Sequence, residues 1–312
     1  MTDLKPDFTK ISLDAWDLPI FRETGLRTDI LRLDKIHPEI SGNKWFKLKY
    51  YLEKANADHK NILISFGGAY SNHLLALAVM AHASGFRSIG LIRGEQPAHL
   101  SHTLTAVKQY GMQLIFLPRT VYDLKKRYGL LEGVEKFTHL HPETVSRSII
   151  IPEGGAGFEG LRGCEEILSL IPQPEYTHVC MAVGTGTTMA GMINASQMHL
   201  KIIGISVLKG TCDLEPLEVS WIKDPARLAN VQMVHDYHFG GYAKYNGALI
   251  GFMNKTYAES GIPTDFVYTG KLLFAVISMA EMKLFPPGSR ILVIHTGGLQ
   301  GNRSLTPGLL GF

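Results

Sequence analysis

The sequence of 312 residues predicts an α/β protein built from two doubly wound open sheets. Three observations predict this fold class. Short β-rich runs alternate with helical patterns along most of the chain, which is the order typical of parallel βαβ units. The number of runs fits two sheets better than one. No repeat period, low-complexity tract or long linker separates the halves, so we expect closely packed domains with a cleft between them.

The predicted elements follow one another in this alternating order. The first series reads NILISF (strand), 71–85 (helix), RSIGLIR (strand), a helix that ends at Tyr110, MQLIFLP (strand), a polar helix through the 120s and 130s, and SIIIPEGG (strand). The second series reads 158–170 (helix), HVCMAV (strand), 187–198 (helix), KIIGISVL (strand), helices around Ile250 and Leu273, and RILVIHTGG (strand). Ligands of such folds gather at the carboxyl ends of the strands, so candidate site residues are sought there.

Composition narrows the classes of partner. A formal net charge of +3, with scattered basic residues, argues against nucleic acid and favours a small-molecule ligand. The three cysteines, Cys164, Cys180 and Cys212, lack metal-ligand spacing and predict reduced thiols and no metal site. No apolar run approaches the ~18 residues of a membrane span, and the N-terminus lacks the apolar core of a signal peptide. We therefore expect a cytoplasmic protein without a membrane partner.

The stretch GTGTTMAG, residues 184–191, follows a predicted strand and opens a helix. Backbone N–H groups and the positive end of the helix dipole would converge there on an anion. A dinucleotide fingerprint fails because Met189 occupies the third glycine position, and a P-loop fails because no lysine follows. The remaining interpretation is a phosphate site with hydroxyls from Thr185, Thr187 and Thr188, suited to a phosphorylated cofactor without adenylate. A plain glycine-rich helix cap is the alternative.

The stretch FGGAYSNH offers Ser71, Asn72 and His73 at another strand end. A nucleophile elbow is excluded because the glycine that G-x-S-x-G requires is absent. Ser71 is therefore either an N-cap or, together with the helix N-terminus, a holder of a substrate carboxylate. Two further strand ends, VYTGK and HTGG, carry Tyr268, Thr269 and Thr296.

The stretch SGNKWFKLKY places Lys44 directly before a helical pattern and Lys47 three residues later, on one face. Lysines in water at the start of a surface helix are the simpler interpretation. A chemical role requires Lys44 to be neutral, because only a neutral amine forms a Schiff base. Partial desolvation and the positive charge of Lys47 would lower its pKa toward that state.

These motifs occur together, in the order found in the pyridoxal-phosphate enzymes related to 1-aminocyclopropane-1-carboxylate deaminase and D-cysteine desulfhydrase, and the chain resembles that family over nearly its whole length. The resemblance implies the tryptophan-synthase-β-like fold, known as fold type II, with pyridoxal 5'-phosphate in the cleft between the two sheets. It also implies a large cofactor-binding domain formed by residues 1–49 and 151–312, a small inserted domain at 50–150, and a homodimer.

The resemblance assigns roles by position. It implies that Lys44 carries the cofactor as a Schiff base and that Lys47 helps to hold the phosphate. Asn72 would bond the phenolic oxygen of the cofactor, and Ser71 and His73 would meet the substrate carboxylate. The phosphate would lie in the loop formed by Gly184, Thr185, Gly186, Thr187 and Thr188. Tyr242 and Tyr268 match the two active-site tyrosines of the family, although each could also be a tyrosine of the core or cleft wall.

Substrate choice depends on Thr269 and Thr296, which stand where true aminocyclopropane-carboxylate deaminases carry glutamate and leucine. A carboxylate near the pyridine nitrogen keeps it protonated and strengthens the electron sink needed for ring opening, whereas a threonine does so far less. We therefore expect a small amino-acid substrate, most simply D-cysteine, converted to pyruvate, sulfide and ammonia. The alternatives are deamination of aminocyclopropane carboxylate to 2-oxobutyrate and ammonia, or a non-catalytic cofactor-binding protein of the same fold.

Three positions depart from the family pattern. Trp45 and Phe46 replace a Thr-Arg pair after Lys44, and Leu75 stands where an arginine is common. The roles of those arginines are absent here or filled by other residues. A bulky Trp45 beside Lys44 is also expected to be able to reshape the substrate pocket, which leaves other D-amino acids or β-substituted substrates open.

Overall fold

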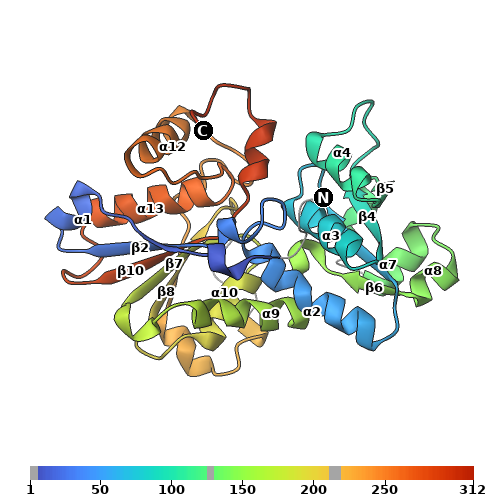
Figure 1. The fold of residues 1–312 in the computed structure, drawn as a ribbon, viewed down its shortest axis with the longest axis horizontal. Coiled ribbons are helices and arrows are strands. Elements are labelled where there is room, and N and C mark those ends of the chain that lie inside the picture. The colour runs from blue at the N-terminus through green and yellow to red at the C-terminus, as the bar shows by residue number, and fades with distance from the viewer. Residues whose placement is uncertain (1–5, 125–129, 211–218) are drawn as a thin grey trace.

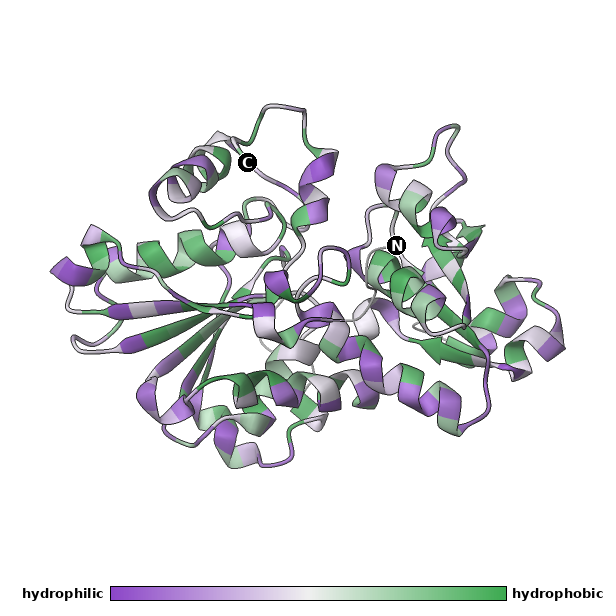
Figure 2. Cartoon of the chain, in the orientation of Figure 1, coloured by the Kyte–Doolittle hydropathy of each residue, from purple (hydrophilic) through white to green (hydrophobic). Residues whose placement is uncertain are grey.

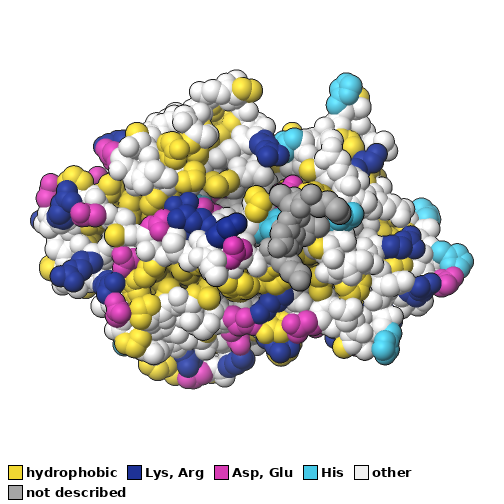
Figure 3. Space-filling view, viewed as in Figure 1, with side chains coloured by type: hydrophobic (Ala, Val, Ile, Leu, Met, Phe, Trp, Pro, Cys, Tyr) yellow, Lys and Arg dark blue, Asp and Glu magenta, His cyan; other side chains and the backbone are white. Residues whose placement is uncertain are grey.

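The computed structural model of the chain describes residues 6–124, 130–210 and 219–312. It contains two sheets that lie beside each other, each covered by helices on both faces (Figure 1). Within the described residues no helix is long and apolar enough to cross a membrane. Cys164 and Cys180 are buried free thiols, whereas Cys212 lies outside the described residues. Basic and acidic side chains are interspersed over the face seen in Figure 3.

The larger sheet has six strands in the order β1-β2-β10-β7-β8-β9. Their bounds are Leu13–Ala15 (β1), Arg27–Arg32 (β2), Arg290–His295 (β10), His178–Val183 (β7), Lys201–Ser206 (β8) and Val231–Val234 (β9). All neighbours are parallel except β1 and β2. The strands β1, β2 and β9 are not among the predicted elements, because β1 has three residues and β2 breaks its apolar pattern with charged side chains.

Helices cover both faces of the larger sheet. One face packs against α1 (Pro19–Glu23) and α13 (Thr269–Glu281), and α12 (Gly247–Ser260) lies on α13. The other face packs against α10 (Thr187–Ala195), with α9 (Phe158–Glu165) beside it. Two apolar core clusters follow from this layering, and apolar residues accordingly concentrate along the strands and on helices such as α13 and α3 (Figure 2).

The smaller sheet is fully parallel, in the order β5-β4-β3-β6. Its strands are Gln113–Leu117 (β5), Arg87–Arg93 (β4), Ile62–Gly67 (β3) and Ser148–Ile151 (β6). Helices α2 (Asn43–Ala57), α3 (Asn72–Ala83) and α4 (His102–Gln109) contribute to the core cluster on one side. The core cluster on the other side of this sheet includes residues from three short helices, α5 (Arg119–Asp123), α7 (Leu130–Phe137) and α8 (Pro142–Ser146).

Seven 3-10 helices complete the described elements. They are Phe8–Lys10, Leu33–Ile36, Glu153–Gly155, Glu166–Leu170, Gln173–Glu175, Pro225–Asn230 and Leu299–Ser304. The polar helix predicted through the 120s and 130s is divided between α5 and α7, with residues 125–129 outside the described part. The predicted fold class, an α/β protein with two doubly wound sheets, is confirmed.

Candidate active site

One cavity of about 670 Å³ lies where the carboxyl ends of strands from both sheets meet. Its walls include the last residue of β4 and residues that follow β3 in the smaller sheet, together with residues that follow β7 and β10 in the larger sheet. Twelve of the predicted site residues line it: Lys44, Lys47, Ser71, Asn72, His73, Gly184, Thr185, Gly186, Thr188, Tyr242, Tyr268 and Thr296. The other two, Thr187 and Thr269, are fully buried and lie outside the lining.

The turn before Lys44 packs directly on the loop after β10. Gly42 has φ of 70°, and a Cβ there would lie 1.8 Å from the carbonyl oxygen of Thr296. The backbone N–H of Asn43 donates to the same oxygen over 3.2 Å. Only glycine permits this approach, so the Ser-Gly-Asn turn fixes where α2 begins and directs Lys44 into the cavity.

The Lys44 ammonium lies in surroundings that disfavour its charge. Burial, and next the positive charge of Lys47, lower the pKa of Lys44 to about 7, although part of the side chain faces the open cavity. Its Nζ donates to Asn43 Oδ1 over 2.8 Å. A substantial fraction of Lys44 is therefore the neutral amine near neutral pH, which is the state a nucleophilic lysine needs.

The loop after β7, which the sequence predicts to bind an anion, brings the start of a helix and a cationic side chain together. Gly186 caps α10 in the left-handed region, and the first N–H groups of this nine-residue helix have no intrahelical carbonyl partner. Lys47 is buried and donates to Thr185 Oγ1 over 3.2 Å, which brings a cation to the loop. The hydroxyl of Thr188 accepts from Asn43 Nδ2 and from Cys164 Sγ. Its own proton is thereby left for an acceptor in the cavity.

The N-terminus of α3 supplies a second set of donors. Ser71 is the N-cap, and its Oγ accepts from the N–H of Leu74 over 3.2 Å. The N-cap interpretation is therefore right, and the serine hydroxyl proton can still reach a cavity ligand. Asn72 Oδ1 is buried and has no hydrogen-bond partner among the described residues. Such an atom is suited to a ligand that completes its bonding.

The imidazole of His73 forms its hydrogen bond with a residue of β3 rather than with the start of α3. Its Nε2 lies 2.7 Å from Ser65 Oγ, and Ser65 Oγ donates its proton to the carbonyl of Ile151. Nε2 must therefore carry the proton that Ser65 accepts, and Nδ1 is a bare acceptor. Burial, with the charges of Lys44 and Lys47, lowers the pKa of His73 to about 3. A neutral ring with an open acceptor does not attract a carboxylate, so this role would fall to the backbone N–H groups.

The two predicted tyrosines, Tyr242 and Tyr268, both line the cavity, and their rings contact each other edge to face. Their ring centroids lie 6.1 Å apart with planes 70° from parallel. Burial raises the pKa of both hydroxyls, that of Tyr268 well above the ordinary value. Both are therefore protonated near neutral pH and can donate hydrogen bonds.

The two predicted threonines differ in accessibility. Thr296 lines the cavity, whereas the Thr269 hydroxyl donates to Asp265 Oδ1 over 2.7 Å. Asp265 is fully buried and also accepts from the N–H groups of Val267, Tyr268 and Thr269. Thr269 is thus committed to fixing the start of α13, and its expected contact with a ring nitrogen has no direct path from the cavity.

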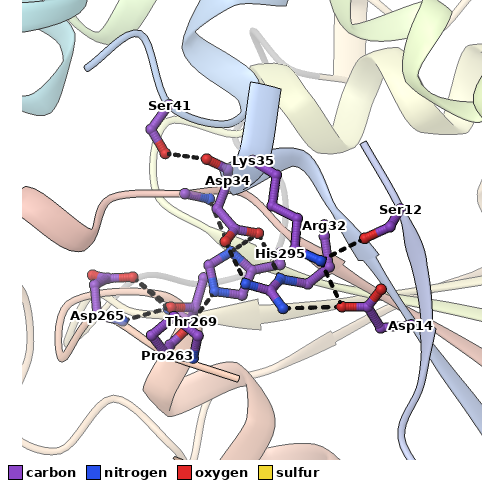
Figure 4. Close-up of polar contacts among 11 residues, drawn as sticks. Ser12, Asp14, Arg32, Asp34, Lys35, Ser41, Pro263, Asp265, Thr269 and His295 are labelled. Atoms are coloured by element: carbon purple, nitrogen blue, oxygen red, sulfur yellow. Dashed lines mark hydrogen bonds and ion pairs between the residues drawn. The ribbon is translucent and has the colours of Figure 1, made fainter. Parts of the chain in front are cut away.

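A buried polar network supports the loop that carries Thr296 (Figure 4). His295 Nε2 donates to the carbonyl of Pro263 over 2.8 Å, and Nδ1 lies 3.1 Å from Asp34 Oδ1. Arg32 binds both oxygens of Asp34 over 2.8 and 2.6 Å. The end of β10 is therefore tied to the segment before α13 and to the end of β2.

Arg93 and Glu153 are cavity residues that the sequence reasoning missed. Arg93 ends β4 and Glu153 follows β6, so the strand-end rule could have identified both. Asp265 was missed as well, although an acidic residue just before a helix is a recognised start signal.

The three departures from the family pattern are apolar packing residues. Phe46 and Leu75 are buried in core clusters. Trp45 packs against the core clusters of both sheets and does not belong to the cavity lining. The expectation that Trp45 reshapes the pocket directly is therefore not met by its position.

Comparison with known proteins gives a consistent result. The family described as pyridoxal-phosphate dependent enzyme matches residues 16–297. A Pyrococcus horikoshii protein named putative 1-aminocyclopropane-1-carboxylate deaminase is 28% identical over 94% of this chain and 93% of its own. The Arabidopsis thaliana bifunctional D-cysteine desulfhydrase/1-aminocyclopropane-1-carboxylate deaminase is 26% identical over 93% of this chain and 76% of its own. A crystal structure of an ACC deaminase homologue superposes with a TM-score of 0.78 at 27% identity, covering 96% of this chain and 92% of that one.

Proposed function

The chain belongs to the family of pyridoxal-phosphate dependent enzymes, and from this premise we propose that it is a deaminating lyase that releases a β-leaving group from a small amino acid. D-Cysteine is the proposed substrate, and pyruvate, sulfide and ammonia are the proposed products. The single observation that carries the proposal is the pairing of an amine whose pKa is about 7, Lys44, with a phosphate-type anion site on its neighbouring loop.

The residues present fit pyridoxal 5'-phosphate. The N-terminus of α10, the hydroxyls of Thr185 and Thr188, and the buried ammonium of Lys47 suit a phosphate. The buried and unpartnered Oδ1 of Asn72 suits a polar ring substituent. When bound, the cofactor supplies an electron sink for negative charge at the substrate α-carbon.

The remaining roles belong to side chains of this chain. Lys44 Nζ, of which a substantial fraction is neutral near neutral pH, would accept the proton from the substrate α-carbon. Ser71 Oγ and the free N–H groups at the start of α3 would hold the substrate carboxylate. Tyr268 and Tyr242, both protonated, would donate to the departing group.

β-Elimination is favoured over ring opening because Asp265, a carboxylate close to the loop that follows Thr296, is already occupied by hydrogen bonds. Asp265 lies close behind Gly298, since a Cβ there would be 3.3 Å from Asp265 Oδ1. The Asp265 oxygens accept four hydrogen bonds from residues 267–269. A second candidate, deamination of 1-aminocyclopropane-1-carboxylate, is favoured by the names of relatives, including the one from Pyrococcus horikoshii.

Keto-acid release by the purified, cofactor-loaded protein tests these alternatives. D-Cysteine, L-cysteine, other D-amino acids with a β-leaving group and 1-aminocyclopropane-1-carboxylate are supplied separately. Pyruvate with sulfide from D-cysteine supports the proposal, and 2-oxobutyrate as the main product supports the second candidate. A protein that binds the cofactor but releases no keto acid from any of them would instead be a non-catalytic member of the fold.

We also propose the domain limits 1–49 with 151–312 and 50–150, a homodimer, and a cytoplasmic location. Support for the domain limits comes from the two sheets, since all strands of the smaller one lie between Ile62 and Ile151. Sedimentation of the purified protein tests the dimer, and cell fractionation tests the location.

A further inference from the structure

Lys271 is a fully buried lysine that the proposed chemistry leaves without a role. It lies on the first turn of α13, three residues after Tyr268, and does not line the cavity. Its Nζ donates to the carbonyl oxygen of His238 over 2.8 Å and to that of Gly241 over 2.7 Å. An ammonium buried this deeply is costly unless it is paired, so two backbone carbonyls at such distances indicate a specific site.

The segment that Lys271 holds has an unusual backbone. Four residues have positive φ: Phe239 at 51°, Gly240 at 96°, Gly241 at 115° and Ala243 at 53°. Phe239 and Ala243 are not glycine, so the left-handed conformation is unfavourable at both and must be imposed by the surroundings. Tyr242 stands inside this strained turn and lines the cavity.

The turn has few internal bonds of its own. The N–H of Gly241 donates to the His238 carbonyl, and the N–H of Lys244 donates to the Gly241 carbonyl. Lys271 bonds the same two carbonyls, so each accepts one bond from the turn and one from α13. Phe274, one turn further along α13, packs edge-on against Phe239 at 4.9 Å between ring centroids. Helix α13 therefore contacts the turn in two ways, through the hydrogen bonds of Lys271 and through the ring of Phe274.

We propose that Lys271 is a positioning residue that clamps the turn 238–244 to α13 and thereby fixes Tyr242 against Tyr268. Tyr268 is the N-cap of the same helix, so both tyrosines take their positions from α13. The inference rests on the proposed function only in assigning Tyr242 to the substrate pocket.

Loss of the Lys271 side chain should change the mobility of the turn 238–244 without lowering the thermal stability of the protein. In Lys271→Met each carbonyl keeps its backbone N–H partner, and an expensive buried charge is removed. We therefore expect no loss of thermal stability. The amides of Gly241 and Lys244 should nevertheless exchange their hydrogens about 10- to 100-fold faster, as expected from loss of bonds to a charged donor. Amides of β7 and of the middle of α13 should exchange as in the wild-type protein.

The experiment compares Lys271→Met, Lys271→Gln and the control Lys255→Met in the cofactor-loaded protein. Lys255 is an exposed lysine of the adjacent helix α12. Gln keeps two N–H donors without a charge, so Lys271→Gln should restore most of the slow exchange, and Lys255→Met should change nothing. Unchanged exchange of Gly241 and Lys244 in Lys271→Met would overturn the clamp. This readout needs no turnover, so it remains decisive even if D-cysteine is not the substrate.

A double-mutant cycle with Tyr242→Phe tests the link to the site. Lys271→Met should lower kcat about 10- to 100-fold, the range expected for a misplaced site group, with a smaller change in KM. In the Tyr242→Phe background the same change should have little further effect, because the positioned hydroxyl is already gone. Equal losses in both backgrounds would show that Lys271 does not act through Tyr242. Lys271→Ala, which also removes both hydrogen bonds to the turn, serves as the second variant if Lys271→Met does not fold.

Discussion

The side-chain amide of Asn43 donates to the hydroxyl of Thr188 over 2.8 Å, while its carbonyl oxygen accepts from Lys44 Nζ. One residue thus connects the reactive amine to the anion loop at the start of α10. Asn43 and Thr188 are 145 residues apart in the chain, so this contact depends on the tertiary fold.

The first prediction is that Lys44→Ala abolishes the covalent attachment of the cofactor. The cofactor-dependent visible band that borohydride reduces should be absent from this variant, because no other lysine is placed on the Ser-Gly-Asn turn. Turnover should fall about a thousandfold or more, equal to ~4 kcal/mol of barrier. Mass spectrometry after reduction locates the modified peptide. A band retained in Lys44→Ala and lost in Lys47→Ala would transfer the role to Lys47.

The second prediction concerns the anion loop. Thr188→Asp places a negative charge where the cofactor phosphate would meet the N-terminus of α10, and it removes the acceptor hydroxyl used by Asn43. Cofactor affinity should fall at least about 100-fold, or ~3 kcal/mol. Thr188→Ser keeps the hydroxyl and is the matched control. Gly186→Asp should have a similar effect, with added strain because φ of Gly186 is 71°. Unchanged affinity in both aspartate variants would exclude the loop as the phosphate site.

The third prediction is the pH dependence of lysine reactivity. The neutral fraction of Lys44 rises with pH, so the rate of attachment of pyridoxal, which has no phosphate, should increase through a midpoint near 7. Lys47→Met removes a like charge, which makes the protonated form of Lys44 less unfavourable and moves the midpoint to higher pH. Lys49→Met, which breaks a contact with Glu166 away from the cavity lining, should leave it in place. A wild-type midpoint near the ordinary lysine value would contradict the prediction.

The fold class and most residues of the cavity lining could be predicted because they depend on local patterns. Strand ends followed by glycines, such as those before Ser71 and Thr185, mark the cavity without knowledge of long-range contacts. Prediction from the sequence fails where a side chain makes a tertiary contact that the local pattern does not indicate. Thr269 has the right position in sequence, but its hydroxyl is taken by Asp265, and nothing in the local pattern distinguishes this bond from a free hydroxyl. Trp45 adjoins Lys44 in sequence yet packs between two core clusters.

The edge strands and the buried lysine show a second limit. β1 has three residues and β9 has four, which is too short for an apolar periodicity to reveal either strand. Lys271 falls at a position that a sequence pattern assigns to a polar helix start. Its hydrogen bonds to the turn 238–244 join segments about 30 residues apart, so no local pattern could indicate them.

The last prediction concerns substrate choice and the two threonines. The wild-type protein should release pyruvate from D-cysteine and little 2-oxobutyrate from 1-aminocyclopropane-1-carboxylate. Thr269→Glu with Thr296→Leu should shift the ratio of these two activities toward ring opening by about tenfold, or ~1.4 kcal/mol. Thr296→Leu removes the side-chain hydroxyl of a cavity residue, and Thr269→Glu adds a carboxylate that could hold a proton on a ring nitrogen once it turns toward the cavity.

The burial of Thr269 against Asp265 calls for a control without the added charge. Thr269 is fully buried against Asp265, so Thr269→Glu would place two carboxylates together and force one of them toward the cavity or to bind a proton. Thr269→Gln with Thr296→Leu has nearly the same shape as the glutamate pair but lacks its charge. This control should lose activity on D-cysteine without gaining activity on 1-aminocyclopropane-1-carboxylate. The cofactor band confirms that each variant is folded and loaded. If the glutamine pair opens the ring as well as the glutamate pair, pocket shape rather than ring-nitrogen protonation determines the substrate. Efficient ring opening by the wild-type protein would contradict the role of the threonines outright.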